Sequence, residues 1–205
     1  MENFKAIILS VAYLSLALEL VFFSVPSVAS TYQLILTDKS DNTINSRLNN
    51  IKKWQSWKKF LFLFTPAIIN ITVFLFPVLY VLGVFKYDII SNEQLSAIVG
   101  LIFLILGRVI TFLSVIQIRK INSSANQQMF LHQKGWFKWS RNPGLLGMYI
   151  FIFGIWLLFS HPLFLGGILF YIGYMHFKVL LEEDYLIEKF GIEYQKYLNQ
   201  TKRYL

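Results

Sequence analysis

Cysteine is absent from the 205 residues of the chain, and charged residues are scarce. The missing thiols exclude disulfide bonds and cysteine-ligated metal sites. Only 15% of the residues are charged, whereas 56% are hydrophobic and 18% are aromatic. Soluble domains carry roughly 25% charged residues. The composition therefore excludes an ordinary soluble domain and predicts an integral membrane protein.

Histidine is also rare, and the usual motifs of soluble enzymes are missing. The three histidines are His132, His161 and His176, and none lies in an H-x-x-x-H or H-x-x-E pattern. No metal site is therefore predicted. There is no Walker loop, no G-x-G-x-x-G and no G-x-S-x-G, so these motifs give no support for a P-loop, a Rossmann site or a serine hydrolase.

Long apolar runs dominate what is present. They cover residues of about 4–29, 60–85, 95–118, 145–159 and 163–181. Only Ser160-His161-Pro162 separates the last two runs, which predicts a tight helical hairpin. We therefore predict an all-α integral membrane protein with about five transmembrane helices, forming a single membrane domain over residues 1–205.

The distribution of lysine and arginine predicts the orientation. Basic residues gather between the first and second runs, between the third and fourth runs, and after the fifth run. The connection between the second and third runs has only Lys86, and the hairpin has none. The positive-inside rule then places the N-terminus outside and the C-terminus in the cytoplasm. The net charge of +8 is accordingly assigned to topology and anionic lipid, not to nucleic acid.

The segment after the fifth run has a different character. Leu186, Phe190 and Tyr194 recur there at helical spacing with charges between them. This pattern predicts a cytoplasmic amphipathic C-terminal helix, bent near Gly191. Its apolar face needs a surface to cover, and the nearest candidate is the loop before the fourth run.

Two charged residues, Glu19 and Arg108, fall at membrane depth. Burying either charge alone is costly, so the two are expected to pair across helices. The alternative is that they grip the polar headgroup of a substrate.

A polar turn opens the fourth run at Arg141-Asn142-Pro143. Pro143 fixes its own φ and restricts Asn142 to extended conformations, so the turn is expected to be rigid. The guanidinium of Arg141 and the free N–H groups of a helix N-terminus suit a carboxylate or phosphate. The alternative is an arginine that only reaches lipid headgroups.

An acidic pair, Glu182-Glu183, closes the fifth run. Adjacent carboxylates suit an amine or ribose hydroxyls, although a solvated helix end is the simpler interpretation. The turn and the pair are expected on the same cytoplasmic face, together with aromatic residues such as Trp136 and Tyr185. Such a set suits an amino-acid-bearing nucleotide such as S-adenosylmethionine.

These residues resemble the isoprenylcysteine carboxyl methyltransferase and phospholipid methyltransferase superfamily of integral membrane methyltransferases. The matching positions are Leu131, Gly135, Phe137, Arg141, Asn142, Pro143 and Gly147, followed by Glu182, Glu183, Leu186, Phe190, Gly191, Tyr194 and Tyr197. The chain departs from the pattern at Leu145, where an aromatic residue is usual, and at Met129, where many members have histidine.

The resemblance implies a cofactor-binding part over about residues 129–203 that holds S-adenosylmethionine. By that analogy Arg141 and Glu183 are the catalytic residues. The cofactor-binding residues would be Leu131, His132, Gly135, Phe137, Arg141, Asn142, Pro143, Glu182, Glu183 and Leu186.

The activity expected from this resemblance is methyl transfer to a membrane-embedded or lipid-linked acceptor, with an isoprenylcysteine-type carboxylate favoured. A phospholipid amine is an alternative acceptor. A sterol-reductase-like NADPH enzyme would share the S-R-x-P turn, but the E-E-x-x-L tail argues against it. A non-enzymatic membrane scaffold is the last alternative, and the gathering of polar residues at one face argues against it.

The expected partner is a lipid or prenylated small substrate that enters from the bilayer, with neither a metal nor a nucleic acid. The expected location is a bacterial inner membrane, or the endoplasmic reticulum in a eukaryote, with the active site facing the cytoplasm.

Overall fold

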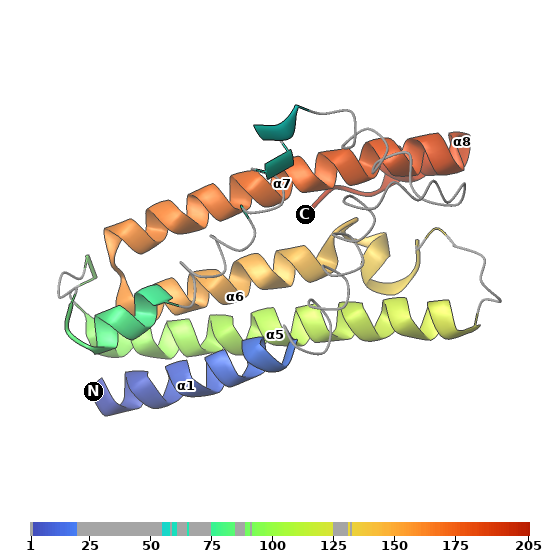
Figure 1. Ribbon diagram of the computed structural model, residues 1–205. Helices are drawn as coiled ribbons and strands as arrows, with labels where there is room; N and C mark the ends of the chain where they lie inside the picture. Colours follow the sequence, from blue (N-terminus) through green and yellow to red (C-terminus); the bar gives the residue numbers. More distant parts are fainter. Residues whose placement is uncertain are drawn as a thin grey trace. The chain divides into compact units, whose positions relative to one another are not determined.

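The computed structural model of the chain is described for residues 2–19, 55–57, 59–60, 65, 75–84, 89–90, 92–124, 131 and 133–205 (Figure 1). Its helices are α1 (Glu2–Glu19), α5 (Glu93–Ser124), the short 3₁₀ helix η2 (Gly135–Lys138), α6 (Pro143–Phe159), α7 (Pro162–Phe190) and α8 (Ile192–Gln200). A further helical segment covers residues 75–81. No strand occurs within these described ranges, so the all-α prediction is confirmed for them.

Two helices are long and apolar enough to cross a membrane, and they cover Glu93–Gln117 and Pro162–Phe190. They correspond to the third and fifth predicted spans. α1 and α6 are shorter apolar helices that overlap the first and fourth predicted spans. Most of the second predicted span, 60–85, lies outside the described residues. The number of five spans and their orientation remain predictions.

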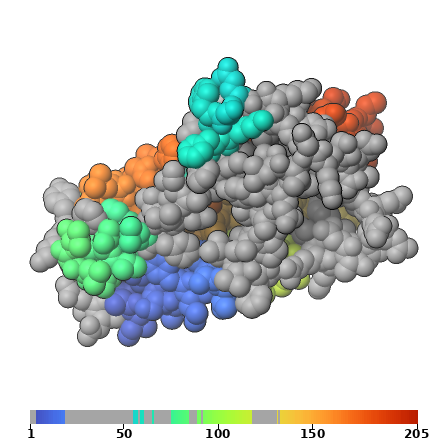
Figure 2. Space-filling model, in the orientation of Figure 1, coloured from blue at the N-terminus to red at the C-terminus, as the bar shows by residue number. Residues whose placement is uncertain are grey.

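The chain divides into two compact units, of which the first contains Met1–Asp88 and His161–Tyr185. In this unit α1 buries Ile8, Leu9 and Leu16, yet Ile7 and Leu14 are exposed on its other side. A helix that is apolar on all sides is typical of a membrane environment. Figure 2 shows α1 in blue next to the segment 75–84 in green.

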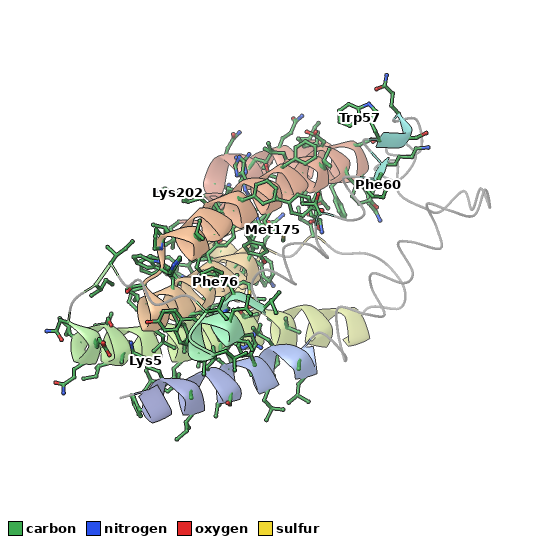
Figure 3. The ribbon with its side chains drawn as sticks, turned by 60° about the vertical axis from the view of Figure 1, so that its left-hand side comes forward. Lys5, Trp57, Phe60, Phe76, Met175 and Lys202 are labelled. Atoms are coloured by element: carbon green, nitrogen blue, oxygen red, sulfur yellow. The ribbon has the colours of Figure 1, made fainter. Side chains whose placement is uncertain are left out.

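An aromatic cluster connects the segment 75–81 to the start of α7 within this first unit. The ring of Phe76, labelled in Figure 3, lies 5.4 Å from the ring of Phe164 and 5.1 Å from that of His161, between ring centroids. Nδ1 of His161 accepts a hydrogen bond from the backbone N–H of Leu163 at 3.2 Å. The ring of His161 thus supports the first turn of α7.

The second unit contains Ile89–Ser160 and Leu186–Leu205, and its centre is the antiparallel pair α5 and α6 (Figure 1). Glycines allow these two backbones to touch. A Cβ added at Gly107 would lie 2.5 Å from the backbone nitrogen of Phe151, and one at Gly154 would lie 2.9 Å from the carbonyl of Gly100. Small residues of this kind are typical of tightly packed membrane helices. The packing fixes the start of α6, where the predicted turn lies.

A buried threonine strengthens this pairing. The hydroxyl of Thr111 on α5 lies 2.9 Å from the carbonyl of Gly107 and 3.2 Å from that of Gly144 on α6. A hydrogen bond of this kind ties the first turn of α6 to α5. At the other end of α6, only Ser160 and His161 separate this helix from α7, as the sequence predicted.

Candidate functional site

The loop before α6 consists of η2 and the turn that follows it. Within η2, Phe137 is buried and Trp136 is exposed, and Trp139, which follows η2, is exposed as well. In the turn, the hydroxyl of Ser140 accepts a hydrogen bond from the backbone N–H of Asn142 at 3.1 Å. Pro143 then occupies the first turn of α6, where its missing N–H has no cost. Asn142 has φ −131° and ψ +57°, so the prediction that it is extended was wrong, and the hydroxyl of Ser140 stabilises the turn.

The C-terminal tail, residues 201–205, is hydrogen-bonded to this turn. The backbone N–H of Arg141 donates to the carbonyl of Lys202 at 2.9 Å. The amide of Asn142 and the hydroxyl of Ser140 both donate to the carbonyl of Arg203, at 3.2 and 3.3 Å. Residues 140–142 thus bind residues 202–203, which lie about sixty positions later in the sequence.

The guanidinium of Arg141 contacts α8, the helix that precedes the tail. Its Nη1 donates to the carbonyl of Leu198 at 3.3 Å, in the last turn of α8. The last carbonyls of a helix have no partner within the helix, and a cation near them is favourable. From the sequence, Arg141 was interpreted as a residue that binds either a ligand or lipid headgroups. The structure adds a contact with the C-terminal end of α8, which neither interpretation included.

Tyr197 joins α8 to η2. Its hydroxyl donates to the carbonyl of Phe137 at 2.6 Å, and its side chain is only 4% exposed. Burial raises the pKa of Tyr197 to about 12, while the positive charge of Arg141 acts in the opposite direction. The buried ring of Tyr194 packs 5.9 Å from it, between centroids. Tyr197 of this segment therefore contacts the loop before the fourth run, while the covering of that loop by Leu186 and Phe190 stays a prediction.

Gln117 on α5 is a polar contact that the sequence interpretation missed. Its side-chain amide donates to the carbonyl of Lys134 and accepts from the backbone N–H of Trp136, the latter at 3.1 Å. Between these partners, Gly135 has a φ of +62°, and a Cβ there would collide with the amide of Gln117. The available signal was one amide near the end of the apolar run 95–118, just before Arg119.

The acidic pair has two different environments on α7. Glu183 is buried at 7% exposure, whereas Glu182 is exposed. Both lie in the first compact unit, while Arg141, Asn142 and Leu186 lie in the second. The convergence of the turn and the acidic pair on one cofactor therefore remains a prediction.

Leu131 and His132 are two further residues of the predicted cofactor site. Leu131 is half-buried, and His132 lies outside the described residues. Arg108 is half-buried on α5, with its guanidinium 4.8 Å from the ring centroid of Phe151, a cation–π contact. The side chain of Glu19 is outside the described part, so its pairing with Arg108 remains a prediction. Among the described residues, no group of three potential metal ligands occurs.

Comparison with known proteins agrees with the motif. The family model described as phospholipid methyltransferase matches residues 95–193. The chain is also 29% identical over 167 residues to the protein-S-isoprenylcysteine O-methyltransferase of Saccharomyces cerevisiae, which covers 75% of this chain. The chain spans 63% of the length of that relative. No solved structure matches the chain. With both halves of the motif present, the chain is similar to the isoprenylcysteine carboxyl methyltransferase and phospholipid methyltransferase superfamily of membrane proteins.

Proposed function

We propose that this protein transfers a methyl group from S-adenosylmethionine to the carboxylate of an isoprenylcysteine-type acceptor in the membrane. The observation that carries the proposal is the turn Arg141–Pro143. It lies within the matched residues 95–193. Three hydrogen bonds from residues 140–142 hold it against residues 202–203. The named relative, an O-methyltransferase of isoprenylcysteine, supports a carboxylate as the acceptor.

The residues of the predicted site fit the cofactor in chemical type. Arg141 offers a planar guanidinium for the carboxylate of the cofactor, and Glu182 and Glu183 offer acceptors for its ammonium group or ribose hydroxyls. When bound, S-adenosylmethionine supplies a methyl group that the sulfonium already activates. The protein therefore needs no strong acid at the leaving group.

The work left to the chain is positioning and the exclusion of water. A nucleophile held in line with the bond that breaks gains at most about 7–11 kcal/mol from orientation. A rigid turn with the tail hydrogen-bonded to it helps to position the reactants. A mobile loop would lose conformational entropy on binding, and this loss would weaken the binding. We place the acceptor's entry from the bilayer side, since its lipid part is soluble only there.

In this proposal the site faces the cytoplasm, because the basic loops and the tail lie on that side by the positive-inside rule. The membrane would be a bacterial inner membrane, or the endoplasmic reticulum in a eukaryote. Five transmembrane helices with the N-terminus outside complete the proposed topology.

A second candidate acceptor is the amine of a phospholipid, which the description of the matching family favours. The two products differ in their stability to alkali. A methyl ester releases methanol in base, whereas an N-methyl group survives. Incubation with S-adenosylmethionine labelled in the methyl group, followed by alkaline treatment, therefore separates them. A farnesylated cysteine and phosphatidylethanolamine, each in vesicles, are the two acceptors to test.

The first experiment is calorimetric binding of S-adenosylmethionine, or its demethylated product, to the purified protein in detergent. NADPH serves as the comparison ligand. Micromolar binding of the methyl donor alone supports the proposal, and binding of NADPH alone would favour a reductase instead. Glu183→Ala and Arg141→Ala are expected to abolish binding in a protein that remains folded. Wild-type affinity in either variant would remove that residue from the site.

A further inference from the structure

We infer that Gln117 is a positioning residue that holds the loop Lys134–Trp136 in the conformation required for the methyl donor. The inference deepens the proposed function and rests on it, because it names a residue outside the motif that prepares the motif for binding. Gln117 lies near the end of the predicted apolar run 95–118, two positions before Arg119. It is therefore placed close to the predicted cytoplasmic boundary, before α5 ends at Ser124.

The contact is a two-point clamp on the backbone. A glutamine side chain carries both a donor and an acceptor, and here the donor meets the carbonyl of Lys134 while the acceptor meets the N–H of Trp136. Two antiparallel hydrogen bonds from one amide fix both the position and the direction of the peptide between them. An ionised Glu can only accept, Lys can only donate, and Met makes neither bond well, so none of these side chains of similar length replaces the amide.

Gly135 is the complementary half of the clamp. Its φ of +62° lies in the left-handed region, which glycine adopts without cost. A Cβ at this position would collide with the same amide that grips the two neighbours. The glycine of the motif and the glutamine on α5 therefore require each other, and this pairing gives the motif glycine a physical reason.

The clamp also determines which way η2 faces. With Lys134 and Trp136 held on α5, the next residue, Phe137, is buried, and its carbonyl meets Tyr197. Arg141 follows four positions later, at the start of the turn. The loop is thus held at its beginning by α5 and at its end by the tail. Loss of the first hold should let the predicted cofactor residues move while the helices stay folded.

The test compares Gln117→Met with Gln94→Met in the full-length protein. Methionine keeps the length of the side chain but makes neither hydrogen bond. Gln94 is exposed in the first turn of the same helix, so it controls for the substitution itself. We expect Gln117→Met to weaken the binding of S-adenosylmethionine about tenfold, with a melting temperature close to that of the wild type. Gln94→Met should leave the affinity unchanged.

Amide hydrogen exchange of the peptide around Trp136 gives a readout that needs no ligand. Exchange about tenfold faster in Gln117→Met than in wild type supports the clamp. Unchanged exchange in Gln117→Met overturns the inference. If the wild type binds the methyl donor, an equal affinity in Gln117→Met overturns it as well. Wild type that binds no methyl donor sinks the proposed function, while the exchange result still decides whether Gln117 holds the loop. Should Gln117→Met fail to fold, Gly135→Ala tests the same clamp from the loop side.

Discussion

Replacing Tyr197 by phenylalanine tests how α8 is joined to the loop. The change keeps the buried ring and removes only the hydroxyl that donates to the carbonyl of Phe137 at 2.6 Å. That carbonyl then loses its buried partner, which costs about 1–3 kcal/mol. For a chain of 205 residues, about 2 kcal/mol corresponds to a fall of roughly 4–8 °C in melting temperature.

The same residue makes the loss depend on pH in a defined direction. Tyr197 titrates near its ordinary pKa of 10.0 when unfolded and at about 12 when folded, because burial disfavours the phenolate. The stabilisation is therefore complete below about pH 10 and is lost as the pH rises toward about 12. The difference in stability between wild type and Tyr197→Phe should accordingly shrink over that range.

Thermal unfolding in detergent, followed by circular dichroism at several pH values from 8 to 11.5 or so, measures both effects. Tyr194→Phe is the matched control, since it removes a hydroxyl from the neighbouring buried ring of α8 but not from the contact with Phe137. A Tyr197→Phe protein with the melting temperature and alkaline profile of the wild type would refute the reasoning, because the hydroxyl would then contribute nothing to the junction.

Four further predictions concern other parts of the chain. Gly147→Ala should lower stability by about 1–3 kcal/mol, because the new Cβ would lie 2.5 Å from a threonine hydroxyl on α5. Gly166→Ala on α7, where a Cβ meets nothing within 4 Å, should be neutral or slightly stabilising in the same melting experiment. Deletion of residues 201–205 should weaken binding of the methyl donor at least tenfold or so, with the α5–α6 pair still folded by circular dichroism. Arg108→Leu should lower the melting temperature through loss of the contact with Phe151, whereas lost turnover at unchanged melting would make Arg108 a substrate residue.

Much of the second unit could be predicted from the sequence, because prolines and apolar runs mark its helices. The fourth run was predicted at 145–159, and α6 covers Pro143–Phe159, with Pro162 beginning the next helix. The third run was predicted to end at 118, but α5 continues to Ser124. That run was bounded by hydropathy, and the polar turns that follow it contain no proline or glycine to stop the helix.

The contacts of the candidate site were harder to predict, for a physical reason. Arg141 and Asn142 were identified by their side chains, but their partners are the carbonyls of Leu198 and Arg203. Every residue carries a carbonyl, so an acceptor of this kind leaves no mark in the sequence. Gln117 was missed for the same reason, since the partners of its amide among the described residues are backbone atoms of the loop.

These contacts join parts of the two halves of the motif in the folded chain. The first half supplies the turn and the second half ends in Tyr197 on α8, which precedes the tail that binds the turn. Arg141 is then shared between a structural partner in α8 and the proposed carboxylate of the methyl donor. A guanidinium can serve both, because it presents five N–H groups in one plane and stays charged. A lysine would keep the charge but not the planar geometry. An arginine therefore suits position 141 better than a lysine if this residue contacts both α8 and the methyl donor.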